Sequence, residues 1–251
     1  MLDKSLIENL KRVDPDRARA AMFADKSVRS DLLTLYAFHA ELAKVPELVS
    51  EEMIGAIRYQ WWRDALEEIY SGQTVRKHEV VTSLSELISR TEMPRFWLDG
   101  LIDGRERDLD PTPFKSISDA QSYCRKTSGL LMKTAAFCTS PNHDLSALEL
   151  LGEAWGLTGL ARSFRFYSHS MLSEIDFVSL IQTTERSFKE ARQALGKFDA
   201  KLMPAVAYAA LIPKFLKKMA PTDFDPETDV ASYSALSKQL RLMGAVIRGR
   251  I

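Results

Sequence analysis

Long segments without proline or strand-like patterning are the feature that most constrains the fold of this chain. Apolar and polar residues do not alternate over the length of a strand, and no Asn-Gly or Asp-Gly pair joins two β-branched runs. Between the prolines, apolar residues recur at every third or fourth position, which is the period of a helix face. The pattern predicts helices at about 3–11, 15–25, 27–45, 51–71, 79–91, 94–108, 118–138, 143–168, 174–196, 201–219 and 229–248. The sequence has no internal repeat and no low-complexity linker, so we expect one all-α domain that spans 1–251 as a helical bundle.

The charge balance excludes one class of partner. The chain has 34 Lys plus Arg and 34 Asp plus Glu, so its formal net charge at pH 7 is zero. A surface that binds a polyanion normally carries an excess of positive charge. We therefore expect no nucleic-acid partner.

Cysteine usage and the N-terminal segment indicate a compartment. Cys124 and Cys138, with four scattered histidines, supply neither a disulfide framework nor the ligand spacing of a zinc site. No window of 18 consecutive apolar residues is present. Residues 1–11 mix acidic and basic side chains, unlike a secretory signal or a transit peptide. The expected location is cytoplasmic.

A predicted helix at 51–71 carries a charged residue on its apolar face. That face is made of Ile54, Ile57, Trp61, Trp62, Ala65, Leu66 and Ile69. Arg58 projects from the middle of it, and an inward guanidinium must find an anion or carbonyl groups because unpaired burial is costly. Arg58 is therefore either a structural residue bonded to a neighbouring carboxylate or a cavity residue that meets an anionic ligand.

Two other predicted helices repeat this pattern. In 143–168, Arg162 and Ser163 fall on an apolar side, beside a stripe of glycines at Gly152, Gly156 and Gly159. Each glycine in a helix interior costs about 1 kcal/mol relative to alanine, so the stripe indicates either close helix packing or space for a ligand. His39 shares an apolar face with Tyr36, either as a core histidine or as one that faces a ligand.

Motifs in these same segments resemble the squalene/phytoene synthase family, in order, over roughly residues 20–168. They are Tyr36-Ala37-Phe38, Arg58-Tyr59-Gln60-Trp61-Trp62-Arg63, Asp103-Gly104 with Asp108, Tyr123-Cys124 with Gly129, and Leu151-Gly152 with Arg162. The resemblance implies an all-α isoprenoid (terpenoid) synthase fold, in which active members condense two prenyl diphosphates head to head. It also implies a ligand pocket lined by Tyr36, His39, Arg58, Trp62, Asp103, Tyr123, Arg162 and Ser163.

The sequence departs from this family where active members carry two aspartate clusters. Those clusters hold the Mg²⁺ that neutralises the departing diphosphate. Here the first cluster falls on Ala43, Lys44 and Glu47, and the second falls on Ser163, Phe166 and Tyr167, with Arg165 between them. We therefore predict no catalytic residue, no metal site and no cofactor. Mg²⁺ enters only if other carboxylates, such as Asp99 and Asp103 one helical turn apart, replace the lost ligands.

A non-catalytic branch of the same superfamily resembles the sequence better. In the mitochondrial respiratory complex I assembly factors of this branch, the corresponding segments also lack the aspartates. The runs Ala40-Glu41-Leu42-Ala43 and Leu160-Ala161-Arg162-Ser163 resemble that branch. The resemblance implies an assembly or scaffold role with a protein partner in a membrane complex.

Three functions remain open at this point. The first is a pseudoenzyme, either as an assembly factor or as a metal-free binder of a prenyl or lipid phosphate. In that second form, Lys44 and Arg165 would make the pocket positive beside Arg58 and Arg162. The second function is an active prenyl-diphosphate transferase with relocated Mg²⁺ ligands, and the third is a lipid carrier that uses the cavity for transport.

The C-terminal segment 229–251 combines an apolar stripe with basic residues and has no acidic residue after Asp229. The stripe consists of Val230, Tyr233, Leu236, Leu240, Met243 and Ile247, and the basic residues are Lys238, Arg241, Arg248 and Arg250. This helix either completes the bundle or contacts a protein partner or a membrane surface. A peripheral position at the inner membrane face is thus the alternative to a purely cytoplasmic one.

Overall fold

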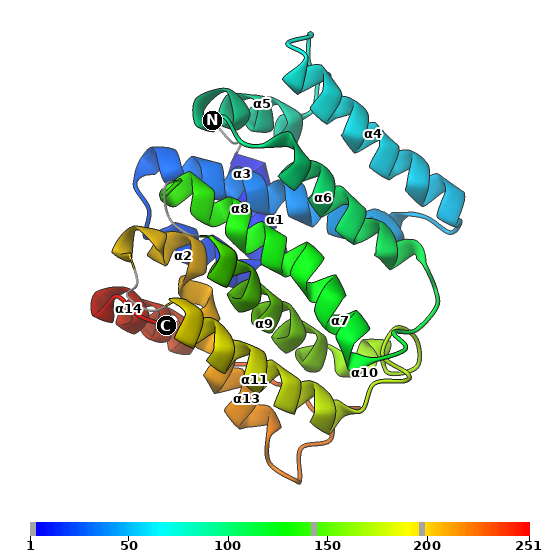
Figure 1. Ribbon diagram of the computed structural model, residues 1–251, viewed down its shortest axis with the longest axis vertical. Coiled ribbons are helices and arrows are strands. Elements are labelled where there is room, and N and C mark those ends of the chain that lie inside the picture. Colours follow the sequence, from blue (N-terminus) through cyan, green and yellow to red (C-terminus); the bar gives the residue numbers. More distant parts are fainter. Residues whose placement is uncertain (1–3, 142–144, 196–198) are drawn as a thin grey trace.

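The computed structural model describes residues 4–141, 145–195 and 199–251, and every regular element in these ranges is helical (Figure 1). The helices are α1 (Lys4–Val13), α2 (Pro15–Ala21), α3 (Lys26–Ala43), α4 (Glu52–Tyr70), α5 (Glu79–Thr91), α6 (Arg95–Glu106), α7 (Ile117–Cys124), α8 (Leu130–Thr139), α9 (Ser146–Arg162), α10 (Phe164–Tyr167), α11 (Phe177–Leu195), α12 (Met203–Val206), α13 (Ile212–Met219) and α14 (Ala235–Arg248). Short 3₁₀ turns are η1 (Val45–Leu48), η2 (Arg107–Leu109), η4 (Ala200–Leu202) and η5 (Ala207–Leu211), and η3 (Arg125–Gly129) is a π-helical turn. The predicted all-α fold is confirmed, and the predicted helix ends at residues 3, 143 and 196 lie outside the described residues.

Several predicted helices differ from the observed ones, and the segment 143–168 is divided at Ser163 into α9 and α10. The segment 118–138 is interrupted by the π-helical turn η3. The segment 201–219 is divided into η4, α12, η5 and α13, because Pro204 and Pro213 each stand in the first turn of a new helix, the position where a missing N–H does least harm. The last helix begins at Ala235 rather than 229, where the Ser234 hydroxyl accepts a hydrogen bond from the Ser237 amide.

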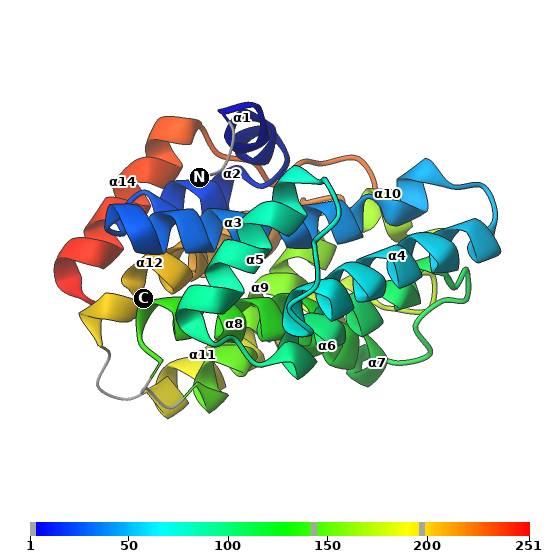
Figure 2. The ribbon, with the colours of Figure 1, turned by 90° about the horizontal axis from the view of Figure 1, so that it is seen from above.

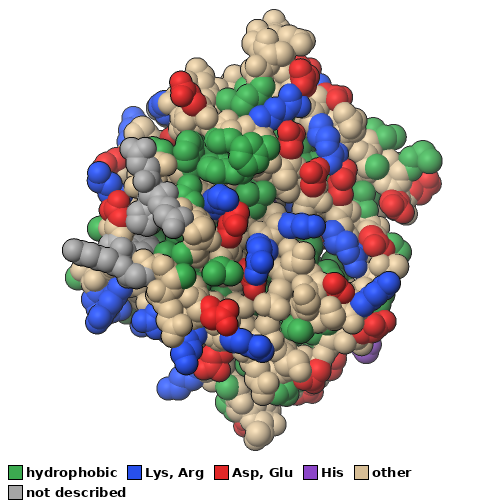
Figure 3. Space-filling model, in the orientation of Figure 1, with side chains coloured by type: hydrophobic (Ala, Val, Ile, Leu, Met, Phe, Trp, Pro, Cys, Tyr) green, Lys and Arg blue, Asp and Glu red, His purple; other side chains and the backbone are tan. Residues whose placement is uncertain are grey.

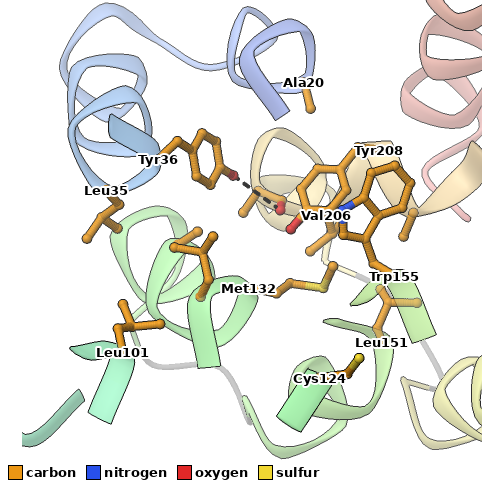
Figure 4. Packing of buried hydrophobic residues seen from close by; sticks show 14 of the residues in the cluster. Ala20, Leu35, Tyr36, Leu101, Cys124, Met132, Leu151, Trp155, Val206 and Tyr208 are labelled. Carbon is orange, nitrogen blue, oxygen red and sulfur yellow. Dashed lines mark hydrogen bonds between the residues drawn. The ribbon is translucent and has the colours of Figure 1, made fainter. Parts of the chain in front are cut away.

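The core is one hydrophobic cluster that joins the two ends of the chain, from Leu6 in α1 to Ala245 in α14. Helix α9 is buried on most of its surface and packs against α8, α11 and η3. Figure 2 shows α3 in a layer between α1 and α8. In the close view of Figure 4, Tyr36 from α3 donates a hydrogen bond at 3.5 Å to the carbonyl of Ala205, so that α3 and the C-terminal segment share this core.

Helix α4 lies at the edge of the bundle, and its buried face matches the predicted one only at Trp62, Ala65 and Leu66. Gly55, Tyr59 and Trp62 are buried, whereas Ile57 is 63% exposed and Arg58 is also exposed. Gly55 allows close contact with Leu109, and the Tyr59 hydroxyl donates to the carbonyls of Leu42 and Arg105 at 3.1 and 2.9 Å. The predicted inward position of Arg58 is wrong, because these tertiary contacts rotate the helix away from the face that its isoleucines suggest.

The length and polarity of the helices bear on membrane contact. Within the described residues, none is both long and apolar enough to cross a bilayer. The longest helices, α4 and α11, have 19 residues each, and charged side chains recur along both of them.

Candidate functional site

A cavity of about 410 Å³ opens between the C-terminal ends of α3 and α9. Its volume lies within the range of small-molecule sites. It is lined by residues from α2, α3, η1, α6, η2, α7, η3, α9, α10 and the loop after α10: Arg17, Ala43, Pro46, Glu47, Arg105, Asp108, Tyr123, Cys124, Thr127, Ser128, Trp155, Gly156, Gly159, Leu160, Ser163, Tyr167 and Met171. Segments far apart in the sequence therefore supply one concave surface.

The positions expected to carry the two aspartate clusters meet in this cavity. Ala43 and Glu47 line one part of it, and Ser163 and Tyr167 line another. Their neighbours do not line it. Lys44 forms an ion pair with Glu41 at 2.6 Å, Phe166 is 67% exposed, and the exposed Arg165 stacks on the Phe166 ring.

The most connected polar group in the cavity is Arg105 of α6. Its Nη1 donates to Asp108 Oδ2 at 3.0 Å and to the Tyr123 hydroxyl at 2.8 Å. Its Nε and Nη2 point at His39 Nε2, at 3.3 and 3.0 Å. Burial, together with the charges of Arg105 and Arg17, lowers the pKa of His39 well below its ordinary value. His39 is therefore neutral and accepts through Nε2, which places its proton on Nδ1.

Arg17 of α2 brings a second guanidinium to the cavity. The Asp14 carboxylate caps α2 by accepting from the Arg17 amide at 3.4 Å and also accepts from Arg17 Nη1 at 2.6 Å. The guanidinium lies over the Tyr208 ring, 5.1 Å from its centroid. Within the described part of the chain, Arg17 Nε is buried with no hydrogen-bond partner, and so is Asp108 Oδ1. Buried polar atoms normally have partners, and both of these atoms belong to residues that line the cavity.

The glycine stripe of α9 combines close helix packing at one end with open space in the cavity at the other. A Cβ at Gly152 would lie 2.5 Å from the Ser128 carbonyl oxygen, so Gly152 permits the close packing of α9 on η3. A Cβ at Gly159 would meet nothing within 4 Å, and Gly159 lines the cavity. Gly156 is intermediate, because it lines the cavity while its Cβ would contact the Cys124 side chain at 2.8 Å.

The structure brings together only part of the predicted pocket. Tyr123 and Ser163 line the cavity, and His39 lies behind Arg105. Two others belong to the core, where Tyr36 is fully buried and Trp62 packs edge-on against Phe38 at 5.3 Å.

The remaining predicted pocket residues lie elsewhere. Arg58 is exposed on α4. Asp103, whose side chain is 64% exposed, pairs with Arg63 at 2.6 Å and lines a separate surface hollow. Arg162 lies over the Phe215 ring at 4.1 Å, outside the cavity lining, and burial lowers its pKa.

Sequence reasoning missed Arg17 and Arg105, and it placed the positive charge on Lys44 and Arg165 instead. Arg105 was detectable, because it stands one helical turn after Leu101 and so shares the buried face of α6. Arg17 gave a weaker signal, since it follows the Asp14-Pro15 helix start but lies among alanines.

The donor set of the cavity does not fit a magnesium-diphosphate site. Glu47 and Asp108 are its two carboxylates, and Asp108 is bonded to Arg105. Among the residues that the structure describes, no group of three or more His, Cys, Asp or Glu side chains is placed to hold a metal ion. The arrangement instead offers hydrogen-bond donors from two guanidinium groups and from the hydroxyls of Tyr123 and Ser128, whereas the Ser163 hydroxyl donates to the Gly159 carbonyl at 2.7 Å.

Comparisons with known proteins give a consistent result. A family model described as squalene/phytoene synthase matches residues 10–166. NADH dehydrogenase (ubiquinone) complex I, assembly factor 6, of Bos taurus is 25% identical over 251 residues, which cover 89% of this chain and 75% of that protein.

Two solved structures share the fold. A dehydrosqualene synthase in complex with ligand gives a TM-score of 0.73 at 15% identity and covers 97% of this chain and 94% of that one. Squalene synthase HpnC from Alicyclobacillus acidocaldarius gives 0.70 at 13% identity, over 86% of this chain and 92% of that one. The predicted isoprenoid-synthase type of helical bundle is confirmed.

Proposed function

The chain belongs to the squalene/phytoene synthase family, and we propose that it keeps the family's fold and cavity while it acts as a non-catalytic assembly factor for a membrane complex. The observation that carries this proposal is the chemistry of the cavity at Ala43, Glu47, Ser163 and Tyr167. By the spacing of the motifs, these are the positions where we expect the aspartate clusters of active members, and Glu47 is the one carboxylate among them. A single carboxylate is a poor substitute for two clusters that hold several Mg²⁺ ions against a diphosphate.

The relatives support the assembly role. Proteins named NADH dehydrogenase (ubiquinone) complex I, assembly factor 6, align with most of this chain. We propose respiratory complex I as the complex that this protein serves, with no cofactor. Peripheral contact at the inner membrane face through residues 229–251 is part of the same proposal.

We expect the purified protein to release no pyrophosphate from farnesyl or geranylgeranyl diphosphate in the presence of Mg²⁺, because the cavity lacks the donors that would neutralise the leaving group. Pyrophosphate release and product extraction measure this directly. In cells that lack the gene, we expect the protein to restore assembled complex I on native gels.

A Glu47→Gln variant separates the two activities. It removes the last carboxylate of the motif positions, so complex I assembly should be restored as well by the variant as by the unchanged chain. Turnover that depends on Mg²⁺ and is lost in Glu47→Gln would establish the active-transferase alternative and overturn the proposal.

A second function is favoured by a specific observation: Arg17, whose buried Nε has no hydrogen-bond partner among the described residues, lines the cavity. Together with Arg105 it provides charge-assisted donors for an anion, and such donors need no metal. We propose that the cavity also binds a prenyl or lipid phosphate directly. If the protein keeps this lipid bound while it moves between membranes, it acts as a lipid carrier. Mass spectrometry of the purified protein would then detect a co-purifying lipid.

We expect farnesyl phosphate to bind with the same affinity in EDTA as in Mg²⁺, measured by isothermal titration calorimetry. Gly159→Leu should abolish binding, because the added side chain enters open space in the cavity without removing a hydrogen bond. Gly159→Ala is the matched control and should bind nearly as tightly as the unchanged protein. Binding that requires Mg²⁺ would refute metal-free recognition.

A further inference from the structure

Helix α14 docks on the bundle through one face and leaves another face uncovered. Lys238, Leu242 and Ala245 are buried against the body, and Lys238 forms an ion pair with Asp16 of α2 at 2.9 Å. The opposite face carries four large apolar residues, here called the α14 stripe: Leu236 (69% exposed), Leu240 (59%), Met243 (41%) and Ile247 (81%). Figures 1 and 2 both place α14 at the periphery of the molecule.

The α14 stripe is a continuous line rather than a set of scattered residues. Its members are four, three and four positions apart, which aligns them on one side of a helix over about 16 Å. An exposed apolar line of this kind marks a surface that contacts something less polar than water. Helix α14 therefore completes the bundle and also exposes an apolar face.

A basic hollow of about 400 Å³ adjoins this helix between α11, α13 and α14. Four arginines line it: Arg192, Arg241, Arg248 and Arg250. The other described residues that line it, Ala210, Pro213, Ala245 and Ile251, have apolar side chains. If Ile251 carried a free backbone carboxylate, the four arginines would still give the hollow a net positive charge. Figure 3 shows Lys and Arg side chains at the lower left edge of this face, where Figure 1 places α14 and the end of α11.

These guanidinium groups are available to an outside anion. Arg241 is held in place because its Nε donates to the Ala210 carbonyl at 2.9 Å. Arg192, Arg248 and Arg250 are exposed, and none of them forms an ion pair with a residue that the structure describes. A planar guanidinium matches phosphate oxygens through two parallel hydrogen bonds. The chain as a whole has no net charge, so this concentration of positive charge is local.

The hollow and the α14 stripe have a fixed geometric relation. Arg241 follows Leu240 and Arg248 follows Ile247, so each arginine projects about 100° around the helix from a stripe residue. A helix that lies in a membrane interface has this arrangement, with apolar side chains in the acyl region and arginines on the flank at the level of the headgroups.

We propose that the arginine hollow binds the phosphate of an anionic phospholipid headgroup while the α14 stripe inserts into the same bilayer surface. The absence of acidic residues between 230 and 251 makes the segment complementary to an anionic surface. A protein partner would have to provide both an apolar groove and an acidic flank. The inference rests on the peripheral contact through residues 229–251 proposed above and specifies its chemistry, and it does not depend on the assembly role or on the cavity.

Co-sedimentation with vesicles tests the apolar contribution. We expect the protein to bind vesicles that contain phosphatidylglycerol and to bind phosphatidylcholine vesicles at least tenfold more weakly. Leu236→Ser, Leu240→Ser and Ile247→Ser together should weaken binding by about tenfold or more. The matched control replaces three other exposed apolar residues, Met53, Ile57 and Phe96, with serine and should bind like the unchanged chain.

A second set of variants tests the hollow. Arg192→Gln, Arg248→Gln and Arg250→Gln together should weaken binding to phosphatidylglycerol vesicles by roughly tenfold to a hundredfold. Arg58→Gln, Arg186→Gln and Lys26→Gln remove the same charge from exposed positions elsewhere and should have little effect. Circular dichroism confirms folding of each variant, whose substitutions are all at exposed positions.

Several outcomes would overturn the proposal. Equal binding to both vesicle types, or an equal loss of binding in a variant and its control, would show that this surface does not recognise an anionic membrane. Release from vesicles by inorganic phosphate, beyond that caused by chloride at equal ionic strength, would identify a free-phosphate site. Failure to bind any vesicle, with capture of a complex I subunit that depends on the α14 stripe, would assign the surface to a protein.

Discussion

Replacing Lys238 with methionine should lower the free energy of unfolding by about 3 kcal/mol, because it leaves the Asp16 carboxylate buried without its main partner. Lys238 Nζ donates to both carboxylate oxygens of Asp16, at 3.0 and 2.9 Å, and the two side chains are 10% and 5% exposed. Arg19, at 3.1 Å from Asp16, compensates only in part because it is more exposed. Urea denaturation of the variant and the unchanged chain measures the difference.

Two further variants show whether the loss comes from the ion pair. The double variant Asp16→Leu with Lys238→Met removes both charges and should recover most of the lost stability, because no unpaired charge then remains in the core. Lys217→Met, on the exposed side of α13, should change stability by less than about 0.5 kcal/mol. A neutral effect of Lys238→Met would contradict the docking of α14 on α2.

Gly152→Ala should destabilise the protein by about 2–3 kcal/mol, although alanine is the better helix former. The new Cβ would lie 2.5 Å from the Ser128 carbonyl oxygen and 2.6 Å from the Gly129 Cα. Both are backbone atoms of the π-helical turn η3, so neither can move aside as a flexible side chain would. Separation of α9 from η3 would also disturb Thr127 and Ser128, which line the cavity. Thermal or urea unfolding measures the loss.

Gly159→Ala is the internal control for this prediction, two turns along the same helix. Its Cβ would meet nothing within 4 Å, so the substitution should raise stability by up to about 1 kcal/mol through helix propensity alone. The same chemical change is thus expected to have opposite signs at the two positions. Equal effects would mean that η3 does not pack on α9 as described.

Most of the helices follow from local patterning. The period of apolar residues located them to within a few positions, because an amphipathic helix that must bury one face needs that spacing. The segment 201–219 was an exception, since its prolines divide a nearly continuous apolar run into short helical turns that packing alone holds together.

Less of the candidate site could be predicted from the sequence. The aligned positions Ala43, Glu47, Ser163 and Tyr167 do meet in one cavity, which the order of the motifs predicted through the family resemblance. Two arginines give the cavity its chemistry. Arg17 stands in a segment that contributed no pocket residue to the prediction, and in the segment of Arg105 the prediction chose the exposed Asp103 instead. A helical wheel reports which residues share a side, but it does not report which side faces a cavity.

The sequence by itself determined the helical class, the family and the absence of aspartates at the motif positions, because these depend on residue spacing and identity along the chain. Only the tertiary structure decided how each helix is rotated. It turned Arg58 on α4 to the solvent, brought Arg105 to the cavity, and left the α14 stripe exposed beside four arginines. Rotation is set by which neighbour buries more surface and satisfies more polar groups, and those neighbours come from distant parts of the chain.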